Sequence, residues 1–406
     1  MKKTLILLAA GLVGFSANAQ SDVLKEAERA MKGDKGYTEV LAIVTPAFTN
    51  PETANNAQTY YIPGKAGFKQ YDNLLGKQQL GMLKDGESLI MANALLGGYD
   101  NFIKALPLDT VVDAKGKTKT KYSKDIVSTV AGHYNDFASA AAEFFNAKEF
   151  DKAYKGWDIF CKLSIDADRF GIKAHPDTLV ANYMFNRSLA AWQNDDFPGA
   201  VQSFREAIQY GYNKPEVFEY GIVAAQNAKD NEAVLEFATE GNKRFGASDP
   251  QYINQIINYY LQTSKYDEAI TYLDAAIADN PNNAQYYALK GIIMDNKGDL
   301  DAASELYRKA LGLDSDNGLA NQYLGRAIGL KAGQLSDAYD GDPTKFADYN
   351  TSTLFPMYKE AVGYLEKAYE VDKANRKSIL ETLNVLYYQL GDDEGMESVK
   401  MRKLDD

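Results

Sequence analysis

The sequence has almost no cysteine or histidine. Cys161 is the one cysteine, and His133 and His175 are the two histidines, in a chain of 406 residues. One cysteine excludes an intramolecular disulfide, a CxxC redox pair and a cysteine-based zinc site. Two histidines leave little material for a histidine-rich metal site or a Ser-His-Asp triad. We therefore predict no metal site and no catalytic residue.

Positively charged residues are fewer than negatively charged ones. Lys and Arg number 44 against 56 Asp and Glu, which gives a net charge of −12. This balance argues against a nucleic-acid-binding protein, which needs a basic surface to neutralise phosphates. We find no GxSxG, HExxH or P-loop motif, and no GxGxxG after a strand, so we expect neither an enzyme nor a bound cofactor. Tryptophan occurs twice, whereas tyrosine occurs 28 times. The tyrosine ring is amphipathic, and a half-buried ring of this kind suits a thin helical array.

Long hydrophobic runs are missing except at the start of the chain. Met1-Lys2-Lys3 is followed by an apolar stretch over 5–15 and by Ala17-Asn18-Ala19. This order predicts a signal peptide over 1–19, with Gln20 as the first mature residue. The apolar stretch is shorter than the ~20 residues that span a bilayer, and no lipobox cysteine is present. We therefore expect a periplasmic or secreted protein without a transmembrane helix.

The strongest pattern is an internal repeat. Ala200, Ala233, Ala269 and Ala303 follow one another at distances of 33, 36 and 34 residues. A large residue stands four positions after each, and a second alanine usually stands seven positions after. The alanines that share this setting are Ala153, Ala200, Ala233, Ala269, Ala303 and Ala361. A small residue commonly lies twelve positions upstream, as Gly291 does, which indicates close contact between two antiparallel helices.

This small, large, small pattern with a period near 34 resembles the tetratricopeptide repeat family. The resemblance implies an all-α solenoid, a superhelix of about seven or eight antiparallel helix pairs. It predicts degenerate helical repeats over 20–125 and a tetratricopeptide array over 126–406 that ends in a C-terminal cap. The signal and the composition also resemble exported tetratricopeptide proteins of Bacteroidetes. Another kind of antiparallel helix array is the alternative.

Two segments break the period. Residues 109–124 predict a short hairpin or an exposed loop, and they carry five lysines at positions 115, 117, 119, 121 and 124. These lysines could contact an acidic partner, or they could belong to a solvated loop. Residues 331–354 predict a loop insertion that either folds as a lid or is a tolerated surface insertion.

In the tetratricopeptide family, the first helix of each pair faces the ligand. Transferred to this sequence, the ligand-facing positions give the candidate partner-binding residues Asn182, Phe185, Trp192, Gln193, Phe218, Gln226, Gln251, Asn254, Asn258, Gln262, Gln285, Asn296, Gln322 and Arg326. Side-chain amides both donate and accept hydrogen bonds, so this face could pair with a peptide backbone or with sugar hydroxyls. Phe185, Trp192 and Phe218 could supply apolar anchors. The alternative is a set of solvated amides above an aromatic core stripe.

The sequence thus predicts a non-catalytic exported scaffold of the cell envelope. We expect it to bind a protein or peptide in a concave groove and not to bind nucleic acid. The alternative is a carbohydrate or small-solute binding protein, and an enzyme accessory is a third hypothesis. The sequence does not indicate an oligomeric state.

Overall fold

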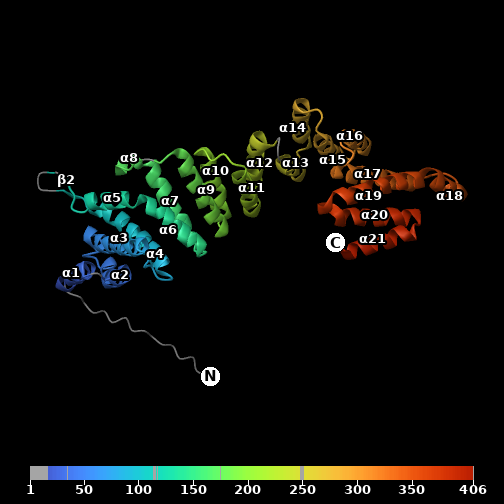
Figure 1. The fold of residues 1–406 in the computed structure, drawn as a ribbon. Coiled ribbons are helices and arrows are strands. Elements are labelled where there is room, and N and C mark those ends of the chain that lie inside the picture. The colour runs from blue at the N-terminus through green and yellow to red at the C-terminus, as the bar shows by residue number, and fades with distance from the viewer. Residues whose placement is uncertain are drawn as a thin grey trace, which may run out of the picture. The chain divides into compact units, whose positions relative to one another are not determined.

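The protein is almost entirely helical, as expected (Figure 1). The computed structural model describes residues 17–33, 35–112, 116, 118–173, 175–246 and 251–405. Most of the expected signal peptide, residues 1–16, lies outside the described residues. The chain divides into two compact units, residues 1–233 and residues 234–406.

The first unit contains helices α1 to α11, with short 3-10 turns η1 (Thr45–Phe48) and η2 (Leu106–Leu108). The helices are α1 (Ala17–Lys32), α2 (Tyr37–Val44), α3 (Ala57–Gln79), α4 (Glu87–Ala105), α5 (Ser123–Gly132), α6 (Tyr134–Asn146), α7 (Phe150–Ile165), α8 (Ala167–Phe170), α9 (Asp177–Gln193), α10 (Phe197–Gln209) and α11 (Glu216–Ala228). Four pairs pack within it: α1 with α2, α3 with α4, α6 with α7, and α9 with α10. Contacts of α4 with α6 and of α7 with α9 join successive pairs.

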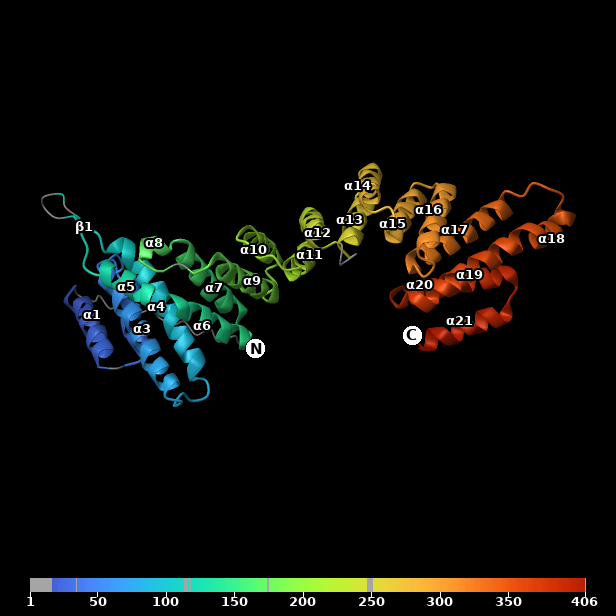
Figure 2. The same cartoon turned by 45° about the horizontal axis from the view of Figure 1, so that its top comes forward.

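The boundary between the units falls inside α12 (Asn231–Phe245), and the second unit continues to α21. Its remaining elements are α13 (Gln251–Gln262), α14 (Tyr266–Asp279), α15 (Ala284–Asn296), α16 (Leu300–Leu313), α17 (Gly318–Asp337), η3 (Pro343–Lys345), α18 (Phe346–Tyr349), η4 (Asn350–Leu354), α19 (Phe355–Val371), η5 (Lys373–Asn375), α20 (Arg376–Leu390) and α21 (Asp393–Asp405). Here α13 pairs with α14, α15 with α16, α17 with α19, and α20 with α21. The pairs stack in chain order, as Figure 2 shows for α19, α20 and α21.

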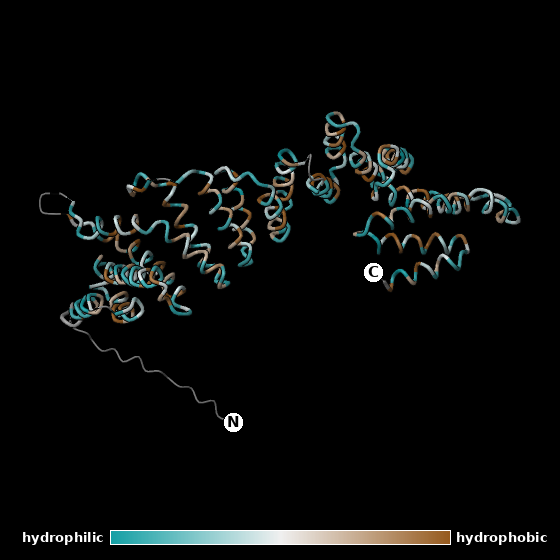
Figure 3. Tube along the Cα trace, viewed as in Figure 1, coloured by the Kyte–Doolittle hydropathy of each residue, from teal (hydrophilic) through white to brown (hydrophobic). Residues whose placement is uncertain are grey.

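Burial confirms the repeat pattern. The six repeat alanines are all completely buried. The large residues four positions later are buried as well, among them Phe204, Leu273 and Leu365, none of which exposes any surface. Each second helix therefore presents a small, large, small stripe to its neighbours, and in Figure 3 the helices accordingly change between hydrophobic and hydrophilic colours along their length.

The small residues of the first helices are required by close helix contact. A Cβ atom added to Gly325 in α17 would lie 2.8 Å from the carbonyl oxygen of Ala361 and 2.7 Å from Cγ of Leu365. A Cβ atom on Gly291 in α15 would lie 2.5 Å from the ring of Tyr307. These distances leave no space for a side chain, so glycine allows the two helices of a pair to approach.

Within 109–124, the described residues include two paired strands, as in the hairpin that was one of the two expected structures, whereas Lys115 and Lys117 lie outside the described residues. Strand β1 (Val111–Val112) pairs antiparallel with β2 (Thr118–Lys119). The carboxylate of Asp109 accepts hydrogen bonds from the backbone N–H groups of Lys121, Tyr122 and Ser123 at 2.6–3.1 Å. Burial alone would raise the pKa of Asp109, but these bonds and one from the Ser123 hydroxyl hold it below its ordinary value. Asp109 thus fastens the base of the hairpin to the start of α5.

The insertion at 331–354 is largely helical, although the sequence indicated a loop. Helix α17 continues to Asp337, and η4, a π-helical segment, runs directly into α19. Tyr339 packs on Phe346 and Tyr349, with ring centroids 5.2 and 4.7 Å apart. Leu354 is almost fully buried, and η4 contacts both α17 and α19. The insertion therefore lengthens its own helix pair, and an aromatic cluster closes the far end.

Candidate interaction surface

The first helices of consecutive pairs touch one another in the second unit. Helix α13 contacts α15, α15 contacts α17, and α17 contacts α20. The second helices α14, α16 and α19 separate these elements in the sequence, but the first helices still contact one another. The first helices therefore form a continuous row, which we call the first-helix face of residues 251–390.

A chain of amide groups crosses this face. The Gln285 side-chain amide donates from Nε2 to Oδ1 of Asn254 at 3.2 Å. Asn317 donates from Nδ2 to Oε1 of Gln285 at 3.4 Å, and its own Oδ1 caps α17 by accepting from the backbone N–H of Ala320. Side chains from α13, α15 and the start of α17 are thereby linked in a row. A primary amide has two donor hydrogens and two acceptor lone pairs, so each member can form further hydrogen bonds.

A second set of contacts extends the face to α20. Gln322 donates from Nε2 to the hydroxyl of Ser378 at 2.9 Å. Arg326 binds Asp295 at 2.8 Å, and its guanidinium lies 5.3 Å from the ring centre of Tyr323. The Asp295 side chain is only 5% exposed, whereas Arg326 remains 45% exposed. The single positive charge among the candidate residues is therefore neutralised and fixed in place.

The other candidates of the second unit also lie at the surface. Asn258 and Gln262 are exposed on α13 and hydrogen-bond to no other side chain among the described residues. Gln251 is exposed at the start of α13, and Asn296 is exposed and donates to the carbonyl of Ile292 at 2.8 Å. The face therefore presents mainly uncharged polar groups.

Two aromatic candidates of the first unit belong to the core. Phe218 exposes none of its surface and Phe185 exposes 9%. The Phe185 ring stacks on Tyr212, with centroids 4.5 Å apart. Phe218 and Ile222 are four residues apart and share one side of α11, so this apolar side turns inward. Neither phenylalanine can act as the surface anchor that the family positions suggested.

Apolar surface does exist in the first unit, but on other residues. Tyr220 is 36% and Val223 is 39% exposed on α11. The Tyr220 ring lies 5.5 Å from that of Trp192, which is half-buried on α9. The polar candidates of this unit, Asn182, Gln193 and Gln226, are exposed. Of the family positions on α11, Gln226 thus lies at the surface, whereas Phe218 is buried.

Sequence reasoning missed Asn317, Ser378 and Tyr220. Asn317 precedes the first residue of α17, and asparagine before a helix is a recognisable N-cap, so its place could have been found. The apolar run on α11 could have indicated that Tyr220 lies opposite the buried side. Ser378 carries no comparable sequence pattern, because only the packing of α20 on α17 brings it to Gln322.

The residues with catalytic potential do not assemble into a reactive site. Cys161 is 1% exposed, and burial raises the pKa of its thiol to about 12, which opposes thiolate chemistry. His133 lies at the edge of the core with Nδ1 2.8 Å from Asp136. His175 has Nε2 2.7 Å from Oδ1 of Asn135, and its ring lies 5.2 Å from that of Tyr134. The described residues contain no group of three or more His, Cys, Asp or Glu side chains that could hold a metal ion.

Comparison with known protein families finds a match in the second unit, where the amide chain lies. Residues 254–318 match the sequence profile of the tetratricopeptide repeat family. We call residues 254–318 the tetratricopeptide segment, after the family profile that they match. The tetratricopeptide segment covers most of α13 to α16, and it contains Asn254, Gln285 and Asn317, the three members of the amide chain.

Two curated relatives match part of the chain. The cell division cycle protein 16 homolog of Homo sapiens is 30% identical over 168 residues, 38% of this chain and 27% of that protein. A tetratricopeptide-repeat-containing protein of Methanocaldococcus jannaschii is 28% identical over 166 residues, 34% of this chain and 28% of that protein. The chain thus spans about a quarter of the length of these relatives. The solved structure of MamA from Desulfovibrio magneticus aligns with 48% of this chain and 96% of its own, at 20% identity and a TM-score of 0.32.

None of the helices in the described part of the chain is both long enough and apolar enough to cross a membrane.

Proposed function

We propose that this protein is a non-catalytic scaffold that binds an extended peptide or protein segment on its first-helix face. The amide chain from Asn254 through Gln285 to Asn317 carries this proposal. It connects first helices of consecutive pairs within the tetratricopeptide segment. Its members hold one another in position and keep hydrogen-bonding capacity for a ligand.

The spacing of the helices suits an extended chain. Packed helices lie about 8–10 Å apart, and an extended peptide advances about 3.3 Å per residue. Amides on neighbouring first helices would therefore meet a bound peptide at about every third residue. Asn258 and Gln262 continue the polar surface along α13 and would pair with the same backbone. The uncharged character of the face favours recognition of backbone groups over recognition of a charged terminus.

A carbohydrate or small solute is the second candidate ligand. Sugar hydroxyls donate and accept hydrogen bonds as amides do, so the exposed amides also fit this class. A peptide-binding protein and a sugar-binding protein would capture different partners, so one experiment distinguishes them. The full-length protein is used to capture partners from an envelope extract for mass spectrometry, and in parallel it is applied to a glycan array.

The test compares the wild-type protein with the triple variant Asn254→Ala, Asn258→Ala, Gln262→Ala. Three lost hydrogen bonds, at about 0.5–1.5 kcal/mol each, should weaken a groove-bound partner by at least about tenfold. A matched control replaces three exposed amides on other helices, Gln79, Gln202 and Gln209, by alanine.

Loss of protein capture in the triple variant alone supports the scaffold. Glycan hits that vanish in the triple variant, without protein hits, support the solute binder instead. Equal capture by all three proteins shows that the first-helix face is not the binding site. Circular dichroism of each variant checks that the fold is intact.

We also propose that the protein is exported to the periplasm or beyond the cell, as in tetratricopeptide proteins of the Bacteroidetes envelope. The positive start, the apolar stretch over 5–15 and the Ala17-Asn18-Ala19 site support this proposal. Mass spectrometry of the protein isolated from its host should find Gln20 as the first residue. A retained Met1 would refute cleavage at this site.

A further inference from the structure

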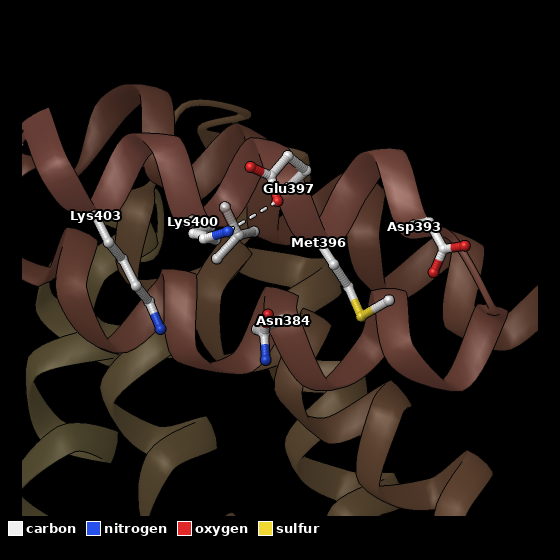
Figure 4. Close-up of a pocket in the computed structure, with 7 residues that line it drawn as sticks. Asn384, Asp393, Met396, Glu397, Lys400 and Lys403 are labelled. Carbon is white, nitrogen blue, oxygen red and sulfur yellow. Dashed lines mark hydrogen bonds and ion pairs between the residues drawn. The ribbon is translucent and has the colours of Figure 1, made fainter.

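The last helix pair, α20 and α21, offers a docking face that no other described helix covers. Earlier first helices in the second unit pack against both helices of the preceding pair: α17 contacts α15 and α16, and α20 contacts α17 and α19. No further described helix packs on the corresponding side of the pair of α20 and α21. A groove of about 460 Å³ lies there, and its lining residues include Asn384 from α20 and Asp393, Met396, Lys400 and Lys403 from α21 (Figure 4).

Large apolar side chains are exposed on the same two helices. Val385 and Tyr388 on α20 are 55% and 69% exposed. Met401 and Leu404 on α21 are 55% and 77% exposed. Single exposed apolar residues are common on protein surfaces, but four of them on one helix pair give this pair apolar surface that suits contact with another helix.

The charged residues of α21 that line the groove are divided by sign. On the groove side, Asp393 and Glu397 occupy the first half of the helix, and Lys400 and Lys403 occupy the second half (Figure 4). Glu397 and Lys400 form an ion pair of 3.3 Å with both side chains more than half exposed. Arg402 points elsewhere and binds Glu366 of α19 at 2.6 Å. The groove side of α21 is therefore acidic at one end and basic at the other.

A helix of this kind is complementary to itself when two copies run antiparallel. With a two-fold axis at residue 398, Asp393 faces Lys403 of the second copy, and Met396 faces the aliphatic stem of Lys400 of the second copy. Each such contact occurs twice, as a two-fold interface requires. A parallel arrangement would instead place like charges together. The 13 residues of α21 span about 20 Å, so the charged ends are far enough apart to set the direction.

We propose that this face binds a second copy of the chain, with the two α21 helices antiparallel. Two helices from each copy make a small interface, so the association is weak and depends on salt. This proposal concerns a different surface from the amide chain and does not depend on the proposed function.

Two charge variants of the full-length chain test the arrangement. Lys400→Glu with Lys403→Glu makes the groove side of α21 acidic throughout, and Asp393→Lys with Glu397→Lys makes it basic throughout. Each variant alone should be monomeric, because like charges then face each other. An equimolar mixture of the two should recover twice the monomer mass, because an acidic helix then faces a basic one. Sedimentation velocity at low salt and submillimolar protein measures these masses.

Lys104→Glu with Lys243→Glu, on exposed positions of other helices, changes the net charge equally and should still dimerise. Circular dichroism checks that each variant keeps its helices. A monomeric wild-type protein overturns the proposal, and so does a dimer that persists in both charge variants. A mixture that stays monomeric overturns the antiparallel arrangement.

Discussion

The hydroxyl of Tyr307 should weaken the fold that its ring stabilises. Tyr307 lies in α16 at the large position of its repeat and exposes none of its surface. Its hydroxyl is buried without a hydrogen-bond partner among the described residues. The same position in other repeats carries Phe204, Phe237, Leu273 or Leu365, so the site needs an apolar side chain and not a hydroxyl.

Two substitutions at this position should therefore have opposite effects. Leaving a buried polar group unpaired costs about 1–3 kcal/mol, so Tyr307→Phe should raise the free energy of unfolding by about 1 kcal/mol or more. Tyr307→Ala removes the ring and leaves a cavity beside Gly291, which should lower stability by about 3–5 kcal/mol.

The stabilisation of the fold by Tyr307→Phe should become larger at high pH. Burial raises the pKa of Tyr307 well above its ordinary value, so the folded protein keeps this proton after the unfolded chain has lost it. Above a pH of about 10, the unfolded state binds fewer protons, and stability falls by up to about 1.4 kcal/mol per pH unit. Phenylalanine has no proton to lose, so the variant should lose stability less steeply than the wild-type protein.

Urea unfolding followed by circular dichroism, together with amide exchange in α15 and α16, measures these changes. Because repeat arrays unfold partly segment by segment, the local exchange reports on this pair directly. Tyr266→Phe, at a half-buried tyrosine at the start of α14, is the control and should change little. A Tyr307→Phe variant that is less stable than the wild-type protein would show that the hydroxyl has a partner and refute the reasoning.

Three further substitutions test the packing. Arg187→Ala should cost about 3–5 kcal/mol in a thermal melt, because it leaves two carboxylates without their buried guanidinium; an unchanged melting temperature contradicts this. Asp109→Asn should cost about 2 kcal/mol at neutral pH. Since the folded pKa of Asp109 is lowered, that difference should fade as the pH falls below about 4, and a pH-independent difference contradicts the assignment. Gly325→Val should cost about 1–3 kcal/mol, whereas Gly333→Val, in open space, should cost far less.

The repeat was predictable because its cause is local and recurrent. Each buried alanine, such as Ala269 or Ala303, marks a close contact between the helices of a pair, and the same contact recurs after about 34 residues. The shape of the 331–354 insertion was not predictable in this way. Gly333 and Pro343 suggested a loop, yet packing against α19 extends α17 past Gly333, which illustrates that tertiary contacts override local propensity.

The candidate surface was predictable only in the regular part of the chain. In the tetratricopeptide segment, the transferred positions Asn254 and Gln285 fall on the face and contact each other. In α11, the apolar residues at positions 218 and 222 rotate the helix so that these family positions become core. Family positions describe a helix whose buried side is already fixed, so they fail where these positions themselves carry the buried apolar residues, as at Phe218 and Ile222.

The excess of tyrosine follows from the same geometry. A helix pair is too thin to surround many side chains completely, so a large ring commonly has one end at the surface. The hydroxyl then reaches a polar group of a neighbouring element: that of Tyr61 lies 2.8 Å from Asp125, and that of Tyr387 lies 2.7 Å from Glu366. Tyrosine thereby fills the core and links elements far apart in the sequence. Tyr307 is buried more deeply than these residues, and its hydroxyl reaches no partner in the part of the chain that the structure describes, so the hydroxyl should be dispensable.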